Sequence, residues 1–272
     1  MLPFGSGTVA LDAAQAICVA LPAAGLPRWL AWARAPGWAL VAPLSIGLVV
    51  GAIAVLPTSA EVLTWIALIG VPLGCALAFG WAMHGARPAL AMLAPVLLAV
   101  VWIWPHELSG ELARTVLIVG SVVTVGRLLA GITPPALLKL GLVAMAVVDA
   151  ILVFGNALQQ PNAVLVAASP GPGLPQLQSA MLHGASLGYG DFFAAGVLGA
   201  VLAAEGRRQL PAAVLLLVVG FAWNLLFWVY DTLPATVPVA VVLVVLEVWR
   251  AATRPRGQAG VPTPAGASAV PR

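Results

Sequence analysis

Apolar stretches of about twenty residues follow one another along most of the chain, separated by short polar connections. A helix needs about twenty apolar residues to cross a bilayer, so the pattern predicts about nine transmembrane helices. They fall near residues 7–26, 37–56, 62–83, 89–105, 112–131, 136–158, 185–204, 211–230 and 233–250. The predicted fold class is an all-α polytopic membrane protein, with residues 1–250 as its membrane domain.

The first stretch has an alternative interpretation as a cleaved signal peptide. It contains Asp12 and Pro22. It has no basic residues in front of the apolar run, and the arginines follow that run instead of preceding it, which is unlike a signal peptide. We therefore expect residues 7–26 to be a span.

Two segments are too polar or too irregular to be spans. Residues 159–183 are uncharged up to His183 and rich in Pro, Gly and Gln, so we expect an extracytoplasmic loop that is either disordered or a functional flap. Residues 251–272 contain several prolines and glycines, and we expect a disordered cytoplasmic tail.

The composition supports a membrane protein. Of the 272 residues, 62% are hydrophobic and 8% are charged, with a formal net charge of +3. Soluble domains carry about a quarter charged residues.

The few basic residues form no cluster, so nucleic acid is not an expected partner. Cys18 and Cys75 lie in apolar segments without metal-ligand spacing, and neither a cofactor nor a metal is expected. Abundant Ala, Val, Leu and Gly suggest a prokaryotic cell membrane.

Basic residues divide unevenly between alternate connections. If the odd-numbered connections are cytoplasmic, that side holds Arg28, Arg34, Arg87, Arg127, Lys139, Arg207, Arg208 and the tail arginines, and the other side holds Arg114. Cytoplasmic loops are enriched in Lys and Arg. The pattern predicts an outside N-terminus and a cytoplasmic C-terminus.

Two acidic residues, Asp149 and Asp191, interrupt consecutive apolar spans. A carboxylate at bilayer depth costs several kcal/mol, so it indicates function. At 1.5 Å per residue, Asp149 is expected roughly 13 Å from the outer end of its helix and Asp191 about 9 Å below the same surface. Antiparallel neighbours would then carry both carboxyls at similar depth, where they can share one proton.

Small residues surround Asp191. Such residues let helix backbones pack tightly. Gly188 and Gly190 also weaken the start of the helix, which would expose backbone donors to a bound peptide. A packing seam between helices would use the same residues, so the glycines gain functional meaning only from the aspartate among them.

The aspartates lie in strings that resemble the motifs of the presenilin and signal peptide peptidase family of intramembrane aspartyl proteases. These strings are Val148-Asp149 followed by Val153-Phe154-Gly155, then Leu174-Pro175-Gln176-Leu177, Gly188-Tyr189-Gly190-Asp191, and Leu233-Pro234-Ala235-Thr236. The third is similar to the GxGD motif and the last to the PAL motif. Val148 and Thr236 stand where the family has tyrosine and leucine.

The resemblance implies an aspartic endopeptidase that cleaves within transmembrane segments. Its catalytic residues would be Asp149 and Asp191, and Gly188, Tyr189, Gly190, Leu233, Pro234 and Ala235 would shape the cleft. The substrate would be a transmembrane peptide or protein in the bilayer. The predicted orientation favours signal-peptide remnants or type II anchors.

Three other functions remain open. A proton-coupled transporter also keeps buried acids, although no inverted repeat is visible. A prepilin peptidase uses a related motif, but a lysine normally follows it where Phe192 stands here. A catalytically inactive scaffold of the same fold would also retain both acids.

Overall fold

The computed structural model describes residues 5–56 and 58–253. In chain order the elements are α1 (Ser6–Ala20), the 3₁₀ helices η1 (Arg28–Ala33) and η2 (Pro36–Leu40), α2 (Val41–Val55), α3 (Ser59–Leu77), the π-helical turn η3 (Ala78–Ala82), the 3₁₀ helix η4 (Pro88–Met92), α4 (Leu93–Ile103), α5 (Leu108–Ile132), α6 (Pro135–Phe154), α7 (Gln159–Ala167), strands β1 (Ser179–Leu182) and β2 (Ala185–Gly188), α8 (Tyr189–Ala204), α9 (Gln209–Asn224), the 3₁₀ helix η5 (Leu225–Trp228) and α10 (Val237–Thr253).

Each predicted span contains a helix in the structure. Five helical segments are long and apolar enough to cross a membrane: Pro36–Val55, Ser59–Ala82, Leu108–Ile132, Pro135–Phe154 and Gln209–Trp228. Three apolar segments, Ser6–Ala20, Pro88–Ile103 and Tyr189–Ala204, are shorter. The described chain is therefore a mainly helical protein with several helices of membrane-spanning length, to which one short hairpin is added.

Several predicted boundaries differ from the structure. The helix predicted at 7–26 ends at Ala20. The loop predicted at 159–183 contains α7 and β1, and the helix predicted to begin at residue 185 begins at Tyr189, after β2. The helix predicted to run to residue 158 ends at Phe154. Asn156 adopts a left-handed backbone with φ 57°, and the Ala157 N–H donates to the carbonyl of Leu152. This is a common way to end a helix.

The final helix also differs from its predicted range. It begins at Val237 instead of residue 233 and continues to Thr253. Residues 251–253, which we expected to begin the disordered tail, are therefore helical. The rest of that predicted tail lies outside the described residues.

A tight turn explains why strands precede α8. β1 and β2 pair antiparallel with Leu182 opposite Ala185. The two turn residues, His183 and Gly184, both have positive φ, at 46° and 80°. Two-residue turns of this kind match the twist of paired strands. The backbone N–H of His183 donates to the Glu111 carboxylate at the start of α5, which fixes the hairpin to the bundle.

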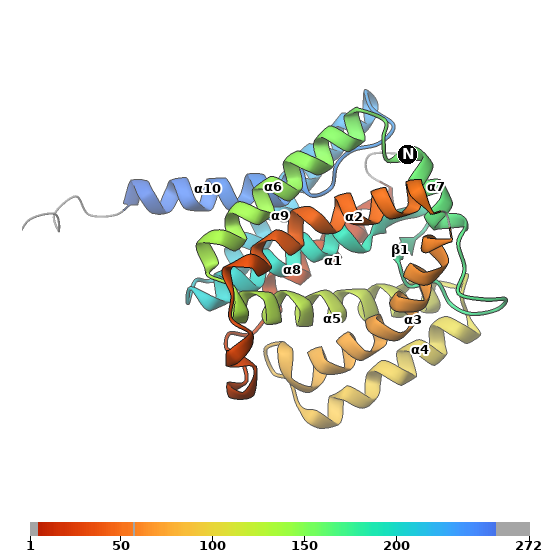
Figure 1. Ribbon diagram of the computed structural model, residues 1–272, viewed down its shortest axis with the longest axis horizontal. Coiled ribbons are helices and arrows are strands. Elements are labelled where there is room, and N and C mark those ends of the chain that lie inside the picture. The colour runs from red at the N-terminus through yellow and green to blue at the C-terminus, as the bar shows by residue number, and fades with distance from the viewer. Residues whose placement is uncertain (1–4, 57, 254–272) are drawn as a thin grey trace, which may run out of the picture.

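Helix α8 lies inside the bundle and packs against α1, α5 and α6 (Figure 1). Residues 192–202 of α8 are all buried. A methyl group on Gly196 or on Gly126 of α5 would overlap backbone atoms of the facing helix. These two glycines therefore let α5 and α8 approach closely, as small residues do in membrane helices.

The ends of the bundle carry different groups. The hairpin and α7 lie at the right-hand end in Figure 1, and α10 extends to the left. Near the start of α6, Lys139 forms ion pairs of 2.5 Å with Glu205 and 3.0 Å with Glu247. Arg207 pairs with the same two glutamates. Charged side chains thus join the ends of α6, α8 and α10.

Candidate functional site

Asp149 lies near the C-terminal end of α6 and is buried, with 7% of its surface exposed. Its Oδ2 accepts a 2.6 Å hydrogen bond from the hydroxyl of Thr236. Thr236 is also buried and directly precedes α10. A hydroxyl donor stabilises the ionised carboxyl without neutralising it, so the bond orients Asp149 and leaves the carboxyl able to exchange a proton.

Asp191 is the third residue of α8 and is half-buried. Its Oδ2 accepts a 3.2 Å hydrogen bond from the backbone N–H of Gly188. The first turn of a helix has free N–H groups, and a carboxylate at this position satisfies one of them. Asp191 therefore lies at the beginning of its helix, and not about two turns inside it as the sequence suggested.

The two carboxyls belong to helices in direct contact. α6 packs against α8, and a methyl group added to Gly190 would lie 4.0 Å from Cε of Met145, one turn before Asp149 on α6. The structure thus places the two acids that the sequence singled out on contacting helices.

The donors to both carboxyls are neutral groups. In the described part of the chain, the only hydrogen bonds to these carboxyls are those from Thr236 and Gly188, and both reach an Oδ2 atom. No Lys or Arg of residues 5–56 and 58–253 forms an ion pair with either carboxyl. A carboxyl without a cation beside it takes up a proton more readily than one that is paired.

The other residues predicted to shape the site differ in how directly they are connected to the aspartates. Gly188 contacts Asp191 directly, and Gly190 is exposed beside it. Ala235 and Asp191 accept hydrogen bonds from one shared donor, Gln15 of α1. Pro234 is buried and Leu233 is half-buried in the same segment. Gly188 and Ala235 are thus tied to the site by hydrogen bonds, and Leu233 and Pro234 are neighbours of Ala235 in the chain.

Tyr189 forms its side-chain hydrogen bond with α5. Its hydroxyl shares a 2.9 Å hydrogen bond with the hydroxyl of Ser121 on α5. This contact anchors the first residue of α8 to α5. The observed contact gives Tyr189 a role in holding the start of α8.

Sequence reasoning missed two residues of the site, Gln15 and Thr236. Thr236 appeared only as a departure from a leucine, and Gln15 received no role. A signal was present in both cases, since polar side chains in apolar spans usually form hydrogen bonds between helices. The partners could not be named, because Thr236 and Asp149 are 87 residues apart.

The chain matches no protein-family model, no curated protein and no solved structure.

A third acid in an apolar helix has a hydrogen-bond partner of its own. Asp12 of α1 accepts a 2.5 Å hydrogen bond from the side-chain amide of Asn224 on α9.

Within the described residues, no group of three or more His, Cys, Asp or Glu side chains could hold a metal ion. Cys18 and Cys75 are buried free thiols.

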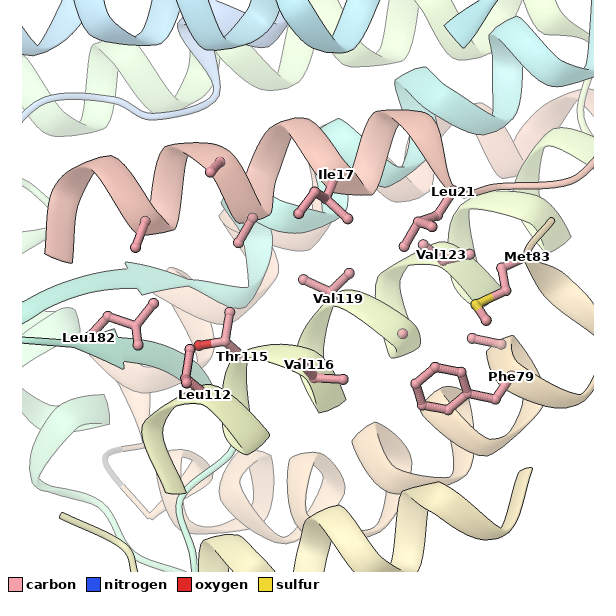
Figure 2. A pocket seen from close by; sticks show the side chains of 15 residues that line it. Ile17, Leu21, Phe79, Met83, Leu112, Thr115, Val116, Val119, Val123 and Leu182 are labelled. Atoms are coloured by element: carbon pink, nitrogen blue, oxygen red, sulfur yellow. The ribbon is translucent and has the colours of Figure 1, made fainter. Parts of the chain in front are cut away.

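An apolar cavity of about 370 Å³ lies beside α1 but does not include the aspartates. Figure 2 shows Ile17 and Leu21 of α1 facing Val119 and Val123 of α5 across it. Its polar side chain, Thr115, donates to the carbonyl of Glu111. The cavity therefore offers space for apolar groups and no acid or base. By helical periodicity, Gln15 projects from the other side of α1.

Proposed function

We propose that this protein is an intramembrane aspartyl protease of the presenilin and signal peptide peptidase type. The observation that carries the proposal is the placement of Asp149 and Asp191 on contacting helices, with neutral donors and no cation paired to them among the described residues. The proposed membrane domain has about nine spans, with the N-terminus outside and the C-terminus in the cytoplasm of a prokaryotic cell.

In the proposed reaction the pair of carboxyls holds one proton. The ionised carboxyl takes a proton from water as the water oxygen bonds to the carbonyl carbon of the scissile peptide. The protonated carboxyl gives its proton to the carbonyl oxygen, which yields a tetrahedral diol. A proton then passes to the peptide nitrogen, the C–N bond breaks, and the products are a carboxylic acid and an amine. The pair again holds one proton at the end.

The substrate must present an extended backbone, because a helix hides its carbonyls in internal hydrogen bonds. The hairpin supports this requirement, since β1 and β2 form a two-stranded sheet that leads directly to Asp191. An extended peptide can pair with the free edge of such a sheet. The proposed orientation favours substrates whose transmembrane segment begins in the cytoplasm, such as signal-peptide remnants and type II anchors.

The test is cleavage of a synthetic type II transmembrane peptide by the purified full-length protein in liposomes, with products identified by mass. Asp149→Asn and Asp191→Asn keep the shape of the side chain and remove its acid. Each should lower cleavage at least about a thousand-fold, because proton transfer and activation of water are both lost.

The matched control is Asp12→Asn. Asp12 is a third acid in an apolar helix and also accepts a hydrogen bond from a neutral group, the amide of Asn224. Its replacement should leave cleavage within a few-fold of wild type. Wild-type rates in either dyad variant would refute the proposal. Substrate flux in sealed vesicles without cleavage would instead indicate a proton-coupled transporter. Absence of both activities would favour an inactive scaffold.

A further inference from the structure

Gln15 connects two segments of the candidate site. It lies in the middle of α1, where only 4% of its surface is exposed. Its Nε2 donates to the backbone carbonyl of Asp191 at 3.1 Å and to that of Ala235 at 3.2 Å. One amide group therefore holds the first turn of α8 and the segment before α10 together.

The segment held by Gln15 is the one that orients Asp149. Ala235 is followed by Thr236, whose hydroxyl donates to Asp149. The carbonyl of Ala235 precedes α10 and lies outside its helical hydrogen bonds, and in the described chain its side-chain donor is Gln15. Losing that donor would leave this segment without its attachment to α1, so Thr236 would no longer be fixed over Asp149.

A second buried glutamine shows what such an amide does elsewhere in the protein. Nε2 of Gln209 donates to the carbonyls of Pro22 at 2.8 Å and Gly199 at 3.0 Å. Its Oε1 also shares a 3.0 Å hydrogen bond with Nε2 of His84. Gln209 therefore joins the segment after α1 to α8 and to the segment after η3. Both glutamines thus stabilise the packing of helices, and the difference between them is what they hold in place.

We propose that Gln15 is a positioning residue that sets the relation between the two carboxyls. It fixes Asp191 through the backbone of that residue, and it fixes Asp149 through Ala235 and the hydroxyl of Thr236. This inference rests on the proposed proteolytic function, since it assigns Gln15 to the same site. The residue acts through others and does not contact the reacting atoms.

The test compares Gln15→Met with Gln209→Met. Methionine keeps the length of the side chain and removes the donors. Both variants should lower the melting temperature, and Gln209→Met should lower it at least as much, because it also loses the hydrogen bond to His84. Gln15→Met should lower kcat for the synthetic transmembrane peptide about 10- to 100-fold, because small misplacements of catalytic groups have effects of this size. KM should change little, and Gln209→Met should keep kcat within about threefold of wild type.

Hydrogen exchange of the same two variants tests the positioning without relying on cleavage. Backbone amides of residues 233–237 should exchange faster in Gln15→Met and remain protected in Gln209→Met. If Gln15→Met does not fold, Gln15→Glu provides the second variant, because it keeps the shape and replaces the donor with an acceptor.

The outcomes separate the two proposals. Equal kcat in Gln15→Met and Gln209→Met, or equal exchange of residues 233–237, would overturn the role of Gln15. A wild-type protein that does not cleave the peptide would refute the proteolytic function, and the exchange result would then still decide whether Gln15 positions the segment before α10.

Discussion

Helices α6 and α8 carry charged side chains at both of their ends, and their surroundings differ. At one end, Glu205 forms ion pairs with Lys139, Arg207 and Arg250. At the other, Asp149 and Asp191 receive hydrogen bonds from a hydroxyl and a backbone N–H. The same helices therefore hold one acid among cations and two acids among neutral donors.

The difference separates structural acids from acids that can carry a proton. A cation beside a carboxyl favours its ionised form and holds the charge in place. Neutral donors orient a carboxyl and still allow it to take up a proton when a second acid is near. The ion pairs at the ends of α6, α8 and α10 can therefore fix these helices while the aspartates remain free to react.

The largest expected difference comes from removing one acid at each end. Asp149→Asn should abolish peptide cleavage and keep the melting temperature close to that of wild type, because the Thr236 hydroxyl can donate to the new amide oxygen. Glu205→Gln should retain cleavage and lower the free energy of unfolding by about 1–3 kcal/mol, because Lys139 loses a charged partner. Cleavage rates and thermal melts of both proteins check this, and the reverse pattern would invalidate the comparison.

Removing the hydroxyl beside Asp149 should have the next largest effect. Thr236→Val preserves the shape of the side chain and deletes the donor. A hydrogen bond to a charged group contributes about 1.5–3 kcal/mol, so kcat should fall roughly 10- to 100-fold. Thr236→Ser should restore most of the rate, since it keeps the hydroxyl. Full activity in Thr236→Val would show that this hydrogen bond does not orient Asp149.

A methyl group added beside the carboxyl of Asp191 should have a smaller effect on kcat. A methyl group on Gly188 would lie 3.3 Å from Oδ2 of Asp191, which is tight enough to displace the carboxyl slightly. Gly188→Ala should therefore lower kcat several-fold. Gly70→Ala in α3 is the control, because a methyl group there meets no atom within 4 Å. Kinetic measurements that find the two variants equal would exclude steric sensitivity at Asp191.

A higher salt concentration should have the smallest effect. It should weaken the ion pairs of Glu205 and Glu247 and leave the two aspartates unaffected. The side chains of Glu247 and Arg250 are 35% and 41% exposed, so ions in solution can screen their pairs. Raising NaCl from 0.05 to 1 M should lower the melting temperature by about 1–3 °C and change kcat less than twofold. A large loss of kcat at constant melting temperature would place a screened charge at the aspartates.

The apolar segments and the two acids could be predicted from the sequence, because hydropathy and a carboxylate in an apolar run are local signals. The start of α8 could not. Residues 185–188 are apolar enough to continue a helix, and their strand depends on pairing with β1 and on the positive φ of His183 and Gly184.

The supporting hydrogen bonds were hidden for a different reason. Gln15 meets Ala235 across 220 residues of sequence, and no local pattern names such a partner. In the sequence, Thr236 counted only as a departure from the PAL motif, yet its hydroxyl contacts Asp149 in the structure. Partners of this kind follow from the packing of α1, α6 and α10 around α8, which only the folded chain shows.

The most direct measurement is the affinity of a transmembrane peptide whose scissile carbonyl is replaced by a hydroxyl-bearing tetrahedral carbon. Such a group resembles the diol that the two carboxyls should stabilise, and analogues of this kind bind far more tightly than substrates. We expect tight binding to wild type and to Asp12→Asn, with affinity at least about 100-fold weaker in Asp149→Asn and in Asp191→Asn. Equal affinity in all four proteins would show that the two aspartates do not act together on a peptide bond.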